Sequence, residues 1–168
     1  PLMQKELNLS STIFKVPLVI ATKLNVPFIN KLENLKEEKI AVPRKYLNID
    51  FFKSKYSNLN IVEVENVQEG LKLLKEGKVY GSVGTLYTVS YRIQSEYFND
   101  LKIAGKINDE LEFVIGVNKN DEILLNILQK SINKIDELHT KEIIDKWAST
   151  IYEKIIDYNL IWQIVTPF

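Results

Sequence analysis

Residues 39–104 read KIAVPRKYLNIDFFKSKYSNLNIVEVENVQEGLKLLKEGKVYGSVGTLYTVSYRIQSEYFNDLKIA. Short apolar runs alternate in this segment with stretches whose apolar residues recur at helical spacing. The pattern predicts the order β-α-β-α-β-α-β. Such alternation is typical of a mostly parallel sheet flanked by helices, so the predicted fold class is α/β. The predicted strands are 39–42, 60–64, 79–84 and 101–104, and the first predicted helix is 49–56.

Residues typical of helix starts precede the predicted helices. Asn66 followed by Glu69 resembles a capping box, in which the two residues satisfy free N–H groups of the first helical turn. Thr85 can cap the next helix, and Asn48 is a candidate cap for the first one.

The flanking segments predict further strands and helices. Residues 13–22 predict a strand, in which Pro17 has no N–H to donate and should lie at an edge or near the strand's start. The remaining predicted elements are a strand at 111–117, a helix at 121–136 and a helix at 141–151, with a break at His139 and Thr140.

The composition is that of an ordinary globular protein. The chain has 168 residues, of which 45% are hydrophobic, and its 22 basic residues balance its 22 acidic residues. This length suits one domain or two small lobes, and the apolar content argues against disorder. A net charge of zero argues against a nucleic-acid partner, and the absence of cysteine excludes disulfides.

The sequence contains no stretch of about 18 uncharged apolar residues, so no membrane span is predicted within it. The chain begins at Pro1 without an initiating methionine and without a signal peptide. We therefore expect it to be a piece of a longer protein. Freedom from cysteine suits a cytosolic protein and equally a periplasmic one.

Few residues suggest catalysis. His139 is the sole histidine and is predicted to be a solvated turn residue. The adjacent carboxylates at 109–110 and 121–122 do not face each other on a strand or a helix. No two-histidine or Cys/His metal site can form, and no glycine-rich phosphate loop is present. We therefore predict a non-catalytic domain without cofactor or metal.

The first candidate site is the turn after the strand at 39–42. Ligands of open parallel sheets bind outside the carboxyl ends of the strands. Arg44, Lys45 and Tyr46 are candidate ligand-binding residues, which either grip an anion against an aromatic wall or form a solvated loop. The other arginine, Arg92, is predicted to form a surface ion pair.

The second candidate site is the turn after the strand at 79–84. Thr85 can cap the following helix and also donate a hydrogen bond to a ligand. Tyr87 is a further candidate ligand-binding residue, although aromatic residues such as Tyr87, Tyr91 and Tyr97 mainly supply buried packing area.

Short motifs in a characteristic order run along nearly the whole chain. They are PLVIATK at 17–23, PFI at 27–29, LENLKEEKIAV at 32–42, NIVEV at 60–64, EGL at 69–71, KEGKV at 75–79, LKIAG at 101–105, FVIGV at 113–117, IDKW at 144–147, YEK at 152–154 and DYNLIW at 157–162. Together they resemble the type 2 periplasmic solute-binding domains. More narrowly, they resemble the Venus-flytrap sensor domains of bacterial sensor histidine kinases and diguanylate cyclases.

The resemblance implies a two-lobe extracytoplasmic module that closes on a small solute, often an amino acid or a similar carboxylate. It implies a location at the periplasmic face of the inner membrane, with membrane attachment through adjacent segments of the parent protein. The implied divisions are a partial lobe 1 with a crossover at 1–38, a complete lobe 2 at 39–104, a return to lobe 1 with C-terminal helices at 105–151, and a juxtamembrane or linker segment at 152–168.

The chain departs from the family pattern at several positions. Lys45 stands where the family usually has glycine, and Thr85 stands where asparagine or aspartate often contacts a ligand amine. The dipeptide at 80–81 is Tyr-Gly where Asp-Ala is common. The family's opening β-α-β-α-β segment, including its carboxylate-pairing arginine, is absent. We expect the missing strands to leave an exposed edge and an apolar face that favour a homodimer.

Three functions are compatible with these observations. The first is a ligand-sensing input module of a signal-transduction protein. The alternative is the solute-binding protein of an ABC transporter. A hydrolase or dehydratase on the same fold would need an acid–base pair, which only Asp50, Glu110 or His139 could supply.

Overall fold

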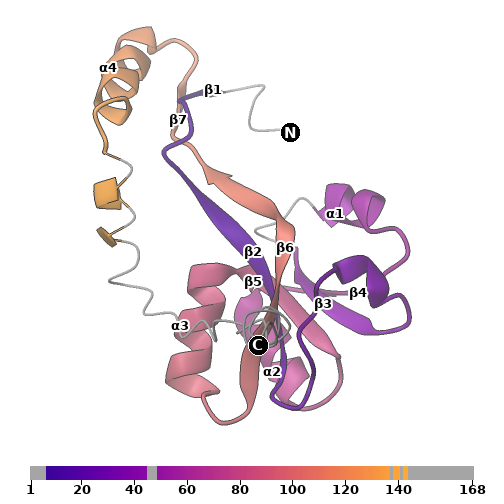
Figure 1. Ribbon diagram of the computed structural model, residues 1–168. Coiled ribbons are helices and arrows are strands. Elements are labelled where there is room, and N and C mark those ends of the chain that lie inside the picture. Colours follow the sequence, from indigo (N-terminus) through magenta and orange to yellow (C-terminus); the bar gives the residue numbers. More distant parts are fainter. Residues whose placement is uncertain (1–6, 45–48, 137, 141, 144–168) are drawn as a thin grey trace, which may run out of the picture.

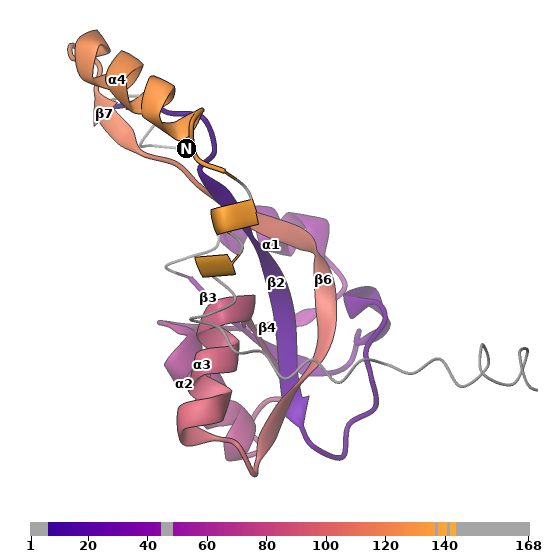
Figure 2. The same cartoon turned by 60° about the vertical axis from the view of Figure 1, so that its left-hand side comes forward.

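The structure, a computed structural model, describes residues 7–44, 49–136, 138–140 and 142–143. These residues form a five-stranded sheet flanked by helices and a smaller second part. A long ribbon of two strands joins the two parts, so the molecule is elongated (Figures 1 and 2).

The five-stranded sheet has the strand order β4-β3-β5-β2-β6. β3 pairs in parallel with β4 and β5, whereas β2 pairs antiparallel with both β5 and β6. In this sheet β2 therefore runs against the other strands, and the predicted mostly parallel α/β arrangement is confirmed. The strands are β2 (Phe14–Lys23), β3 (Lys39–Pro43), β4 (Asn60–Val64), β5 (Gly81–Thr85) and β6 (Leu101–Phe113).

Helices pack on both faces of this sheet, because alternate residues of each strand point to opposite faces. On β2, Val19 and Ala21 belong to a core cluster with α2 and α3, whereas Leu18 and Ile20 belong to a second cluster with α1 and Leu32. The helices are α1 (Ile49–Lys55), α2 (Val67–Lys75) and α3 (Leu86–Glu96), and Leu32 lies in the short 3₁₀ helix η2 (Leu32–Asn34).

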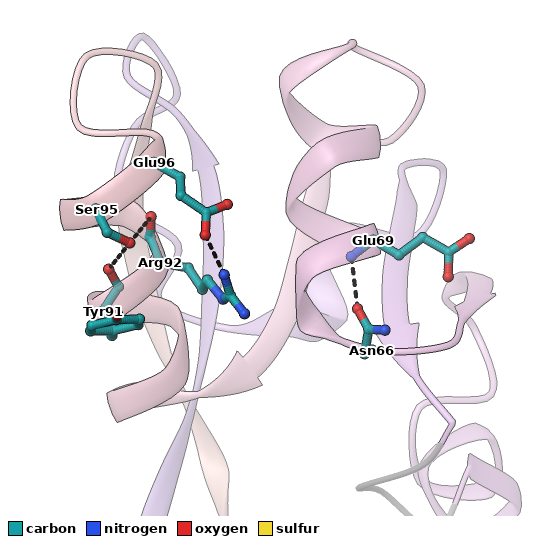
Figure 3. Close-up of polar contacts among 6 residues, drawn as sticks. All are labelled: Asn66, Glu69, Tyr91, Arg92, Ser95 and Glu96. Carbon is teal, nitrogen blue, oxygen red and sulfur yellow. Dashed lines mark hydrogen bonds and ion pairs between the residues drawn. The ribbon is translucent and has the colours of Figure 1, made fainter.

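The predicted capping box at the start of α2 is half formed. The Asn66 side chain accepts a hydrogen bond from the Glu69 N–H at 3.0 Å (Figure 3). The Glu69 carboxylate, however, accepts from the N–H of Glu65 at 2.7 Å instead of from that of Asn66. The helix begins at Val67, as its sequence predicts.

The ribbon consists of the first residues of β2 and the last residues of β6. β2 pairs with β5 only from Leu18 onward, whereas its pairing with β6 extends back to Phe14 opposite Phe113. Pro17 thus lies where β2 has a single neighbouring strand, as its missing N–H requires. The register shifts between Pro17 and Val19 and again between Ile20 and Ala21.

The prediction of two separate strands at 101–104 and 111–117 was wrong. β6 runs without interruption from Leu101 to Phe113, and only a short β7 (Gly116–Asn118) follows it. Polar residues between 106 and 112 hide this continuity in the sequence, because the ribbon keeps one face of the strand in solvent.

The second part of the structure contains β1 (Leu7–Leu9), which pairs antiparallel with β7, and α4 (Glu122–Ile132). Asp121 caps α4 by accepting from the Leu124 N–H at 2.9 Å. The predicted helix 121–136 is too long, because α4 ends at Ile132, and residues 138–140 are helical where the break was expected. Most of the predicted helix 141–151 and all of 152–168 lie outside the described residues.

α4 presents an unburied apolar surface. None of its residues is buried, and Ile123, Leu124 and Ile127 are exposed. The homodimer that such a surface would favour stays a prediction. Over the residues that the structure describes, the helices fall short of the length and hydrophobicity that a bilayer span requires.

A buried tyrosine directly after α1 forms a hydrogen bond to β6. Tyr56 is only 4% exposed, and its hydroxyl donates to the Asp109 carboxylate of β6 at 2.6 Å. Lys55 forms an ion pair with the same carboxylate. Burial and the Asp109 carboxylate both raise the pKa of the Tyr56 phenol.

We predict that Gly105→Ala destabilises the fold by about 1–3 kcal/mol, because overpacking forces the backbone to shift. A Cβ at Gly105 would lie 2.3 Å from the Ile29 carbonyl oxygen, which is backbone and cannot rotate away. Urea denaturation measures the change. The exposed neighbour Lys106 provides the control, since Lys106→Ala should alter stability by less than about 0.5 kcal/mol. Equal stability of the two variants would contradict the prediction.

We predict that Tyr56 makes stability fall at high pH. Because its folded-state pKa is raised, its contribution is complete below the ordinary phenol pKa of about 10 and is lost as pH rises through the folded-state value. Comparing urea midpoints from about pH 8 to 11 should show a steeper decline for the unaltered chain than for Tyr56→Phe. Parallel profiles would show that the phenol does not contribute in this way.

Candidate ligand-binding site

A hollow of about 160 Å³ lies at the carboxyl ends of β3 and β5. β3 ends at Pro43 and β5 at Thr85, and both residues line the hollow. The carboxyl ends of parallel strands are where open α/β sheets bind ligands. The lining residues are Leu18, Pro43, Val67, Gly84, Thr85, Thr88, Leu111 and Phe113.

The ribbon contributes an apolar wall to the hollow. Leu111 and Phe113 come from the β6 strand of the ribbon, and Leu18 follows the ribbon on β2, where that strand begins to pair with β5. Phe14 stacks on Phe113 with ring centroids 4.6 Å apart and planes 15° from parallel. Phe113 remains 40% exposed, so part of its ring is available to contact another molecule.

The other face of the ribbon is charged. Lys15 pairs with Glu112 at 2.7 Å, and these residues alternate along their strands with Phe14 and Phe113. The hydrogen bond from Lys15 lowers the pKa of the Glu112 carboxyl below its usual value. The ribbon thus separates an apolar surface over the hollow from a surface of ion pairs.

The start of α3 supplies the hydroxyl groups of the hollow. Thr85 occupies the N-cap position, as predicted, but its side chain makes no hydrogen bond to the helix backbone. Its Oγ1 instead donates to Thr88 Oγ1 at 2.9 Å. The prediction that Thr85 occupies the N-cap position is therefore confirmed. Its hydroxyl, however, bonds to another residue that lines the hollow and not to the helix backbone.

The remaining candidate residues differ in their placement. Arg44 follows Pro43 but does not line the hollow, and its guanidinium pairs with Glu65 at the end of β4. Tyr87 packs against the core cluster on the α2 and α3 face. Lys45 and Tyr46 lie outside the described residues. Ligand binding by these residues stays a prediction.

Sequence reasoning named only Thr85 among the eight lining residues and missed the other seven, which include Leu18, Thr88, Leu111 and Phe113. Leu111 and Phe113 are two residues apart, so on a strand they lie on the same face, together with Asp109. This spacing was the sequence signal that could have grouped Leu111 with Phe113. The sequence alone could not predict that the face of β6 with Leu111 and Phe113 lines the hollow, because this depends on the pairing of β6 with β2.

The other chemistry-bearing residues lie away from the hollow. Arg92 pairs with Glu96 on α3, as predicted, and the Ser95 hydroxyl donates to the Tyr91 carbonyl at 2.8 Å (Figure 3). His139 is exposed and lies 3.7 Å from the Glu142 carboxylate. Within the described part of the chain, no group of three or more His, Cys, Asp or Glu residues could hold a metal ion.

Comparisons with known proteins place the fold. No model of a protein family matches the sequence, and no curated protein matches it. Solved structures do match. The periplasmic VFT2 domain of BvgS from Bordetella pertussis superposes with a TM-score of 0.76 at 20% sequence identity, over 87% of this chain and 63% of that chain.

Two arginine-binding proteins also match. ArgBP from T. maritima, as its P235GK mutant, has a TM-score of 0.68 at 21% identity, over 88% of this chain and 64% of that chain. An ancestral arginine-binding protein bound to glutamine has a TM-score of 0.69 at 22% identity, over 88% of this chain and 66% of that chain.

This chain thus spans less than two thirds of the length of each of these three structures. The matched architecture includes the mixed sheet flanked by helices that forms the larger part of the molecule. The chain has the α/β fold of the Venus-flytrap, type 2 periplasmic binding proteins, as its sequence motifs implied.

Proposed function

We propose that this chain is part of a ligand-binding Venus-flytrap module, and that a small solute such as an amino acid or a carboxylate enters the hollow beside Pro43 and Thr85. The observation that carries the proposal is the position of that hollow at the carboxyl ends of β3 and β5, roofed by the ribbon. Similarity to arginine-bound and glutamine-bound structures supports a small-molecule ligand.

We propose further that the module senses its ligand for a signal-transduction protein such as a histidine kinase or a diguanylate cyclase. Similarity to the BvgS periplasmic domain supports a location at the periplasmic face of the inner membrane, as part of a membrane protein. The proposed divisions are a partial lobe 1 at 1–38, lobe 2 at 39–104, a return to lobe 1 at 105–151 and a linker at 152–168.

The proposed mechanism is closure of two lobes on the solute. A ligand shifts such an equilibrium only by the difference between its affinities for the closed and the open state. The ribbon joins the two parts of the described structure, and the register shift between Pro17 and Val19, where the ribbon meets the sheet, is a place where a strand can bend. Bending there would move the second part relative to the hollow.

The proposed module is not itself catalytic. None of the described residues that line the hollow is an aspartate, a glutamate or a histidine, so the lining offers no acid–base pair. Asp50, Glu110 and His139 are not among those lining residues. The alternative function is a solute-binding protein of an ABC transporter, which the similarity to ArgBP favours.

We predict that ligand binding perturbs the backbone amides of the hollow. In ¹⁵N-labelled protein titrated with amino acids and small carboxylates, the amide signals of Gly84, Thr85 and Thr88 should shift. Thr88→Phe should fill the hollow and weaken binding by about tenfold or more, because a phenyl ring occupies the ligand's space.

Lys72→Phe on the exposed surface of α2 adds the same ring away from the hollow and should leave binding unchanged. Shifts confined to other parts of the molecule, or equal affinities of the two variants, would contradict the proposed site.

The sensor and transporter roles predict different losses when the codons for residues 7–143 are removed from the gene in its native cell. A sensor predicts loss of the transcriptional or second-messenger response to the solute, with its uptake intact. A transporter component predicts loss of radiolabelled solute uptake. Lost uptake with an intact response would overturn the sensor assignment.

A further inference from the structure

The hollow is lined without a charged side chain among the residues that the structure describes. Six of the lining residues are apolar or glycine, and the remaining two are Thr85 and Thr88. The two threonine hydroxyls are neutral and already hydrogen-bond to each other at 2.9 Å. A group that enters this hollow therefore meets apolar surface and neutral hydroxyls.

Among the described residues, two charged pairs near the lining residues in the chain are engaged elsewhere. The Arg44 guanidinium pairs with Glu65, and neither residue lines the hollow. Lys15 and Glu112 pair with each other on the ribbon face that alternates with the Phe14 and Phe113 face. Among the described residues, the lining therefore offers no carboxylate to receive an ammonium group.

The start of α3 also disfavours a cationic group in the hollow. The first turn of this helix contains no acidic residue, and Thr85 and Thr88 from that turn line the hollow. A helix N-terminus carries partial positive charge, which favours an anion and disfavours a cation. An ammonium group here would lose water without gaining a carboxylate partner among the described lining residues.

The size of the hollow suits a small apolar group. Its volume of about 160 Å³ is close to the roughly 150 Å³ of an apolar protein cavity that accommodates benzene. The exposed part of Phe113 and the side chains of Leu18 and Leu111 provide the contact surface for such a group.

We infer that the ligand of this site is a small carboxylate with an uncharged, apolar body and without an α-ammonium group, and that it places this body in the hollow. This inference rests on the proposed ligand-binding function and narrows its ligand class. It distinguishes the chain from a binder of zwitterionic amino acids, in which an ammonium group needs a carboxylate partner.

Matched pairs of compounds test the inference. The labelled chain is titrated with 4-methylpentanoate and leucine, and with 3-phenylpropanoate and phenylalanine, and the members of each pair differ only in the ammonium group. From the Gly84, Thr85 and Thr88 amide shifts, we expect the ammonium-free acid of at least one pair to bind about tenfold or more tightly than its amino acid.

A carboxylate introduced into the hollow should reduce or remove this preference. Thr88→Asp places a carboxylate in the lining and in the first turn of α3, where an acidic residue stabilises the helix. The variant should bind the amino acid of the pair about tenfold more tightly than the unaltered chain does. Thr88→Asn has a similar size without the charge and should keep the original preference.

The outcomes separate the inference from the proposed function. Amino acids that bind the unaltered chain at least as tightly as the ammonium-free acids, with shifts at these amides, would overturn the inference and leave the ligand-binding function standing. Absence of shifts with all the compounds at millimolar concentration, together with the wider panel above, would overturn the proposed site and the inference with it.

Discussion

The pairing of β2 with both β5 and β6 holds the architecture together. β2 is antiparallel to its two neighbours, and its side chains enter both core clusters of the sheet. The same strand continues past the end of its pairing with β5 and carries β6 with it as the ribbon. Without this pairing, Leu111 and Phe113 would have no fixed position over the ends of β3 and β5, and the hollow would lose its apolar wall.

Local patterns were sufficient to predict the helix-flanked sheet. The apolar faces of α2 and α3, the Asn66 cap and the short buried strands each depend on residues close together in the sequence. The length of β6 was not predictable in the same way. Its solvent face carries Lys106, Asn108 and Glu110, so its regularity depends on hydrogen bonds to a strand about 90 residues away in the chain.

The candidate site was predictable only in part for the same reason. Thr85 ends β5, which pairs in parallel with β3, and the general rule for the ends of parallel strands identified its turn. The rule identified Arg44 too, yet could not reveal that Glu65 at the end of the adjacent β4 pairs with its guanidinium. The contribution of Phe113 to the hollow was not predicted, because the pairing of β6 with β2, which are far apart in the sequence, determines its position.

The unlike faces of the ribbon have a mechanical consequence. Curling the ribbon toward Lys15 and Glu112 would crowd paired ions together and strip their water, which is unfavourable. Curling it the opposite way would hide the Phe113 ring and the Leu111 side chain from water, which is favourable. The two faces of the ribbon thus favour bending toward the side of Phe113 and Leu111 over bending toward the side of Lys15 and Glu112.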